Sequence, residues 1–351
     1  MIGNQDLRDA VQRGVITEAQ AAGLTAIAES RRQAVAGVGP GEEPFVLFKG
    51  FNEIFIVVGL SILFLGWIGI STMLGAEAFS PGGLDTVLVA IVTLLGLAAV
   101  QRYFTLTRRM IAPSMALAIM TALTAWALGW AVANVVGVDG LPASALASGV
   151  VVGLMLLHFR TFRVPFDAAI IAMAAFSTVW SLLAGGGILP DDGLSLLHLS
   201  GTGPLSVLSL AFGLLTFALA MRFDMSDPLR VSTRSTTGFW LHVTSAPAIV
   251  NTTAMHLLAN GQGGQLLLLV FLLAIAGVAL VIDRRSFLVS GAGYAVWLIF
   301  TLFDRSALVI LFLGFGLVFL GAQWDRLRSG LMNRLPDFPG KHRLPPYAST
   351  T

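Results

Sequence analysis

The chain has 351 residues, of which 56% are hydrophobic and only 11% are charged. An ordinary soluble domain carries about 25% charged residues, so this composition excludes a soluble protein of this size. The net charge of +2 is too small to indicate nucleic acid binding. The lack of cysteine excludes disulfide bonds, thiolate metal sites and cysteine nucleophiles.

Residues 1–43 are expected to form a small cytoplasmic helical hairpin followed by a linker. Two helices should meet at Gly14, and the run TEAQ from Thr17 to Gln20 fits the capping box that begins a helix. The stretch "GVGPGEEP" at 37–44 is rich in Gly and Pro and ends the second helix. A protein partner, if the chain has one, is expected to bind this hairpin.

The predicted fold of residues 44–322 is an all-α, polytopic transmembrane bundle of about ten helices. Apolar residues gather there in runs of about 17–25, the length that crosses roughly 30 Å of hydrocarbon. Residues 323–351 are expected to form a cytoplasmic tail. The ten predicted spans are 54–74, 85–101, 110–137, 142–159, 165–184, 204–221, 237–259, 265–282, 286–303 and 306–322.

The basic residues predict the orientation of this bundle. If the N-terminus is cytoplasmic, 20 of the 21 Lys and Arg residues fall on the cytoplasmic side, and only Arg305 falls outside. Such a bias is the positive-inside rule, so both termini are expected in the cytoplasm. The lipid bilayer is the expected partner, with anionic headgroups at the basic loops, and these residues require no nucleic acid partner.

The cytoplasmic boundaries of the predicted spans resemble one another. Even-numbered spans end in "QRYF", "HFRTFR", "MRFD" and "VIDRR", and two odd-numbered spans open with "RRMIAPSMALAIM" and "FRVPFDAAIIAM". One interpretation is a two-helix unit used several times, as in many transporters. The other is that selection for basic inner loops produced this similarity by itself.

Three ionisable residues are expected at a similar depth near the cytoplasmic end of the spans: His158, Asp167 and His242. Ionisable side chains inside hydrocarbon cost about 2.5–3.5 kcal/mol on insertion scales, so each needs a reason. A His–Asp–His cluster could relay protons or bind a cation. The alternative is three unrelated residues that reach headgroups or water.

The seventh predicted span, "FWLHVTSAPAIVNTTAMH", is unusually polar. Its polar face carries His242, Ser245, Thr252, Thr253 and His256. This face is expected to point into the bundle, with Asn251 on the opposite side bonded to a neighbouring helix. Pro247 removes a backbone hydrogen bond and would allow a bend. A cavity lining and ordinary helix packing, with hydroxyls bonded to their own helix, are the two readings.

No enzymatic activity, metal or other cofactor is expected, since the chain has no P-loop, HExxH or GxSxG motif. Haem is a remote alternative. His158 could pair with His242 on the inner side, and His256 with His198 on the outer side. A second helix with two histidines, as in bis-histidine cytochromes, is missing.

The piece "GVITEAQAAGL" resembles the helical opening of predicted bacterial membrane proteins of the DUF2157 kind. The pieces "FKGFNEIFIVVGL" and "GFWLHVTSAPAIV" are similar to segments of related multi-span proteins. The resemblance implies the bacterial inner membrane and brings no known activity. In those relatives a second histidine stands where this chain has Asn251, which counts against a metal or haem site here.

Two classes of function follow. The first is a transporter- or channel-like protein with a polar site between spans four, five and seven. The second is a non-catalytic membrane scaffold or accessory subunit that recruits a partner through the N-terminal hairpin. A cavity beside span seven would favour the first, and a dry, fully packed span seven the second.

Overall fold

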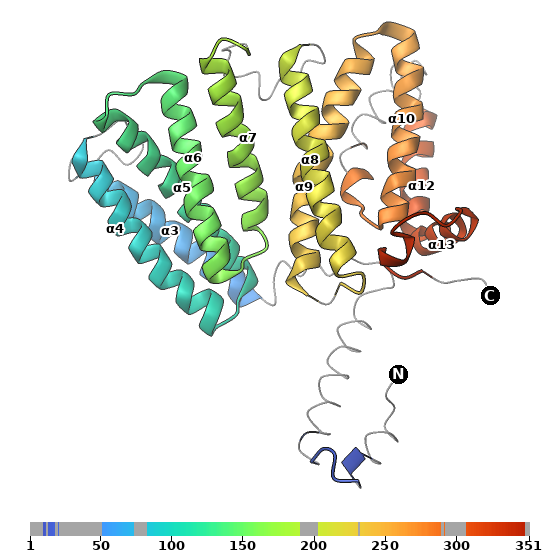
Figure 1. Cartoon of the computed structure of the whole chain (residues 1–351), viewed down its shortest axis with the longest axis horizontal. Helices are drawn as coiled ribbons and strands as arrows, with labels where there is room; N and C mark the ends of the chain where they lie inside the picture. Colours follow the sequence, from blue (N-terminus) through green and yellow to red (C-terminus); the bar gives the residue numbers. More distant parts are fainter. Residues whose placement is uncertain are drawn as a thin grey trace. The chain divides into compact units, whose positions relative to one another are not determined.

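A computed structural model describes residues 10–11, 13–17, 20, 51–73, 83–189, 203–230, 232–288, 291 and 307–347. The chain divides into two compact units, residues 1–46 and residues 47–351. All regular structure within the described residues is helical (Figure 1), which confirms the all-α prediction.

The described part of the first unit contains the predicted break and cap. Gly14 has φ +68°, a left-handed conformation that ends a helix, and its N–H donates to the carbonyl of Val11 at 3.0 Å. The Thr17 N–H donates to Gln20 Oε1 at 2.9 Å, and the Gln20 N–H donates to Thr17 Oγ1 at 3.2 Å. Both bonds of a capping box are therefore present. The remainder of the predicted hairpin lies outside the described residues.

The second unit is a bundle of long helices. The helices are α3 (Phe51–Met73), α4 (Leu84–Gln101), the π-helix η1 (Arg102–Thr107), α5 (Ile111–Val135), α6 (Gly140–Phe162), α7 (Asp167–Gly185), α8 (Pro204–Ser226), α9 (Thr233–Leu258), α10 (Gly261–Ile282), α12 (Ala307–Ala322), α13 (Trp324–Arg334) and the 3-10 helix η3 (Lys341–Arg343). They follow the predicted spans closely.

Seven helices of the described part are long and apolar enough to cross a membrane: α3 to α8, with α4 continued through η1, and α10. The second unit is thus a multi-pass transmembrane bundle. Two further predicted spans fall short by this measure, because α9 is more polar and α12 has only 16 residues. The predicted span 286–303 lies mostly outside the described residues, so the count of ten stays a prediction.

Small residues bring α5, α6 and α7 together. A Cβ on Gly129 of α5 would lie 2.4 Å from the Cα of Ala147 on α6, so the two backbones touch there. Ala118 and Ala125 of α5 belong to one buried cluster with Ala174 of α7. Small residues suit membrane helices, since close backbone approach replaces the hydrophobic driving force that lipid does not supply.

One end of the bundle has a recurring backbone turn. After α4 with η1, after α6, after α8 and after α10, the chain places one non-glycine residue in the left-handed region. These residues are Arg109, Arg163, Arg230 and Asp283, with φ between 52° and 57°. Such conformations are uncommon outside glycine. Selection for basic inner loops explains the arginines but does not require a left-handed residue in each turn. The shared backbone geometry therefore supports the interpretation of a repeated two-helix unit. We call this end of the bundle the basic end.

Within the second unit, the described C-terminal residues 324–347 pack against the ends of the long helices. Trp324 Nε1 donates to Asp283 Oδ1 at 2.7 Å, and Arg230 Nη2 donates to the Asp283 carbonyl at 2.6 Å. Arg328 is buried, and its guanidinium donates to the carbonyls of Pro345 and Pro346. Burial lowers the pKa of Arg328, while the Asp283 carboxylate opposes this change. The predicted tail therefore includes a packed helix.

Candidate functional site

A buried histidine–aspartate pair joins α6 to α7 at the basic end. His158 lies in the last two turns of α6, and Asp167 is the first residue of α7. His158 Nδ1 and Asp167 Oδ2 are hydrogen-bonded at 2.6 Å, and the two residues are 6% and 0% exposed. A carboxylate is favoured at a helix N-terminus, which helps to place Asp167. The sequence predicted these two residues together, and the structure joins them.

Each member of this pair keeps one polar atom without a partner. His158 Nε2 and Asp167 Oδ1 are buried and make no hydrogen bond with the part of the chain that the structure describes. The ring of Phe162 lies 4.7 Å from the His158 ring, centroid to centroid. A buried polar atom without a partner costs free energy, so such atoms in a native protein call for an explanation. Here the two atoms can accept a proton or bind a water molecule.

A second buried cluster joins α8, α9 and the turn after α10. Arg284 donates from Nε to Asp224 Oδ2 at 3.0 Å and from Nη2 to Asp224 Oδ1 at 2.5 Å, a bidentate ion pair. His242 Nε2 lies 3.0 Å from Asp224 Oδ2. Arg284 also donates to the carbonyl of Ser235 at 3.0 Å. His242 is completely buried, and both carboxylate oxygens of Asp224 are engaged.

The surroundings of this cluster are close-fitting. A Cβ on Gly238 would lie 2.5 Å from Asp224 Oδ1, so only glycine leaves room for the carboxylate at this position of α9. The rings of Phe217 and Phe287 lie 5.5 Å and 5.9 Å from the His242 ring, centroid to centroid. The cluster is therefore enclosed by aromatic rings and by a glycine contact.

The structure thus replaces the predicted His–Asp–His cluster with two separate pairs. His242 is bonded to Asp224 rather than to His158 or Asp167. Sequence reasoning missed Asp224 and treated Arg284 only as a loop residue. The sequence contained a signal for Asp224, because this acid lies inside the apolar helix that ends at Ser226. An acid inside a membrane helix needs a partner.

Two hydroxyl residues of the predicted polar face of α9 are enclosed by the bundle. Ser245 and Thr252 are buried; Ser245 Oγ donates to the carbonyl of His242, and Thr252 Oγ1 donates to Ser209 Oγ of α8 at 2.9 Å. The helix runs without interruption through Pro247.

The outer part of that face differs from the prediction. Thr253 is half-buried and His256 is exposed. Asn251 is also half-buried, and its predicted bond to a neighbouring helix stays a prediction.

Neither histidine–aspartate pair belongs to a group of described side chains that could hold a metal ion. Within the part of the chain that the structure describes, no three His, Asp or Glu side chains gather closely enough to hold a metal ion. His158 and His242 are each bonded to their own aspartate, which gives no support to a haem between them. His198, the other histidine of that prediction, lies outside the described residues.

The long apolar helices define the chain as a multi-pass helical membrane protein. No family model matches the chain, and no curated protein or solved structure matches it either. The resemblance to proteins of the DUF2157 kind therefore stays a prediction.

Proposed function

We propose that this chain is a proton-coupled membrane transporter whose proton-binding group is the His158–Asp167 pair. The supporting observation is a buried, hydrogen-bonded histidine and aspartate on adjacent helices, each with one unpartnered atom. Ionisable residues inside a membrane bundle are by default candidates for proton relays. We also propose the bacterial inner membrane as its location, with both termini in the cytoplasm.

The pair can exist in two charge states. With a single proton, on the ring Nδ1 toward Oδ2, the imidazole is neutral, the carboxylate is ionised and the pair carries one negative charge. One more proton makes the pair neutral, as imidazolium with carboxylate or as imidazole with carboxylic acid. His158 Nε2 and Asp167 Oδ1 are the acceptor atoms left for that proton. Binding of this proton therefore changes the charge between α6 and α7. A local change of charge of this kind can shift a protein from one conformation to another.

The Asp224 cluster has a different role in this proposal. Its carboxylate is neutralised by Arg284, which is fixed by a bidentate bond and by the Ser235 carbonyl. Arginine keeps its charge in proteins, so this pair does not exchange protons. The cluster braces α8, α9 and the end of α10 while the α6–α7 pair is loaded and unloaded.

Solid-supported membrane electrophysiology tests the proposal without knowledge of the substrate. Proteoliposomes on the electrode receive a step in pH, and we expect a transient current from proton binding. Asp167→Asn should abolish this current, and His158→Gln should reduce it. Asp139→Asn is the matched control, because Asp139 is an exposed carboxylate at the start of α6 that caps nothing. An unchanged current in Asp167→Asn would refute the assignment.

A membrane scaffold is the second candidate, and a specific observation favours it. The polar residues of α9 that face inward are used in packing, as the Thr252–Ser209 bond and the enclosed His242 show. A wild-type protein that gives no current after a pH step, yet is folded and monodisperse, would favour this reading. Its partner would then bind the N-terminal hairpin.

A further inference from the structure

The helices α3 and α4 form an open wedge on α5. Each packs on α5, while they make few contacts with one another. A hydrogen bond bridges the wedge: Trp67 Nε1 on α3 donates to Thr93 Oγ1 on α4 at 2.7 Å. On one side of this bridge lies an apolar groove of about 310 Å³, whose floor includes Leu97, Leu117 and Met120.

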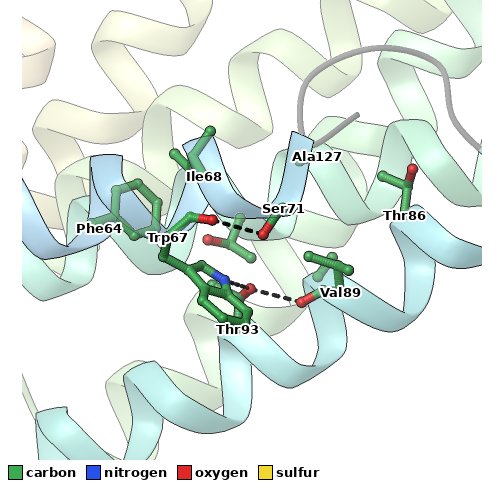
Figure 2. Close-up of a pocket in the computed structure, with 10 residues that line it drawn as sticks. Phe64, Trp67, Ile68, Ser71, Thr86, Val89, Thr93 and Ala127 are labelled. Carbon is green, nitrogen blue, oxygen red and sulfur yellow. Dashed lines mark hydrogen bonds between the residues drawn. The ribbon is translucent and has the colours of Figure 1, made fainter. Parts of the chain in front are cut away.

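The bridge closes the groove at one end. Beyond Trp67 lies a second cavity, of about 30 Å³. Figure 2 shows Ser71 and Thr86 in its wall. Thr93 is held in turn by its own bond to the Val89 carbonyl at 2.7 Å. The groove itself faces outward, since Leu63 and Val92 in its walls are 71% and 56% exposed.

The groove is about two thirds as deep as one bilayer leaflet. Thr93 lies in the middle of α4, which runs from Leu84 to Gln101. From Thr93 to Val100, at the other end of the groove, the helix rises about 10 Å at 1.5 Å per residue. One leaflet contributes about 15 Å of hydrocarbon. An alkyl chain that enters from the basic end would therefore reach the bridge near the middle of the bilayer.

Three arginines follow the groove residue Val100 along the chain, at the basic end. Arg102, Arg108 and Arg109 are all exposed there. Arg108 is held in place, because its Nε donates to the hydroxyl of Tyr103 at 2.9 Å. Glu53, near the start of α3, is buried and accepts the Ala112 N–H at 3.1 Å, so its carboxylate does not face the mouth. The mouth is complementary to an anionic headgroup.

We infer that this groove binds an anionic phospholipid from the leaflet at the basic end. One acyl chain lies along Val100, Leu97 and Gly96 up to the Trp67–Thr93 bridge. The phosphate lies among Arg102, Arg108 and Arg109. The site is separate from the His158–Asp167 pair and does not depend on the proposed transport activity.

Gly96 offers a direct test, because a Cβ at this groove residue would meet nothing within 4 Å. Gly96→Leu thus adds an apolar side chain to the groove at a position where its Cβ has room. Gly153→Leu is the matched control, since Gly153 on α6 has equally open surroundings and lies away from the groove. Native mass spectrometry of the full chain, titrated with phosphatidylglycerol or with phosphatidylcholine, reports how much lipid is retained.

For Gly96→Leu we expect the apparent Kd for phosphatidylglycerol to rise about tenfold. This is the binding free energy lost when roughly two methylenes of the acyl chain are displaced from the groove. The Arg108→Gln variant should lose only the preference for phosphatidylglycerol over phosphatidylcholine. Gly153→Leu should bind like the wild type. Equal lipid retention by the Gly96→Leu and wild-type proteins would overturn the inference, as would equal losses in both leucine variants.

Discussion

At the scale of single residues, the most constrained position is Gly238. Its missing side chain is the space that the Asp224 carboxylate occupies, and this carboxylate holds both Arg284 and His242. A buried acid that is tied to an arginine stabilises the bundle only while its geometry is kept, since a separated buried charge is costly. The packing of α8 against α9 thus depends on a glycine that carries no chemistry of its own.

We therefore expect Gly238→Ala to destabilise the protein by about 1–3 kcal/mol, the usual cost of overpacking. The added methyl would also approach the Ala220 carbonyl at 3.2 Å, so α8 and α9 have to separate. Gly153→Ala is the control and should gain up to about 1 kcal/mol from better helix propensity. Thermal unfolding in detergent measures both. A Gly238→Ala protein as stable as the control variant would show that the carboxylate can move freely.

Residue pairs could be predicted from the sequence only where the chain is short between them. His158 and Asp167 are nine residues apart across one turn, so their proximity followed from the helix boundaries. Asp224 and Arg284 are 60 residues apart, and their contact depends on how α8, α9 and α10 pack. Nothing in the pattern of apolar residues specifies that packing, so His242 was assigned to the wrong aspartate.

At the scale of helices, the left-handed residues at the basic end have a measurable cost. A non-glycine residue in this region is strained by roughly 1–2 kcal/mol, because its Cβ approaches the following carbonyl oxygen. Arg163 is such a residue, with φ 53° and an exposed side chain. Arg160, three residues earlier, is inside α6.

These two arginines should respond in opposite directions to glycine. Arg163→Gly is expected to stabilise the protein by about 1 kcal/mol through relief of strain. Arg160→Gly removes the same charge but should destabilise by about 0.5–1 kcal/mol, because it places glycine within a helix. Parallel unfolding curves in one detergent give the comparison. If both variants lose stability to the same extent, the backbone at Arg163 is not strained, and the loss of a positive charge alone explains the change in stability.

Most helix boundaries could be predicted, because the ends of a long apolar run indicate where a membrane span begins and ends. The predicted span 142–159 corresponds to α6 from Gly140 to Phe162, and 165–184 corresponds to α7 from Asp167 to Gly185. The π-helix from Arg102 to Thr107 was not foreseen. Its hydrogen bonds run to the fifth residue instead of the fourth, and this change has no signature in residue composition.

At the scale of the whole molecule, charge divides the bundle along its axis. Arginines gather where α4, α6, α8 and α10 end, and the acids Asp85 and Asp139 lie near the starts of α4 and α6, at the opposite end. This segregation is what the positive-inside rule predicts for a helical membrane protein. The rule also depends on the number of spans, since one span more or fewer moves the C-terminus to the other side.

The orientation can be measured with single cysteines, because the chain has none of its own. We expect cysteines that replace Asp139 and Arg305 to react with a membrane-impermeant maleimide in intact cells. Cysteines that replace Thr161 and Thr351 should react only after permeabilisation, since both are predicted to be cytoplasmic. Asp139 precedes α6 and Thr161 lies in its last turn, so the two positions calibrate the two sides. Labelling of the Thr351→Cys variant in intact cells would show an odd number of spans. The predicted span 286–303 would then be the first to re-examine, and the reaction at position 305 would identify it.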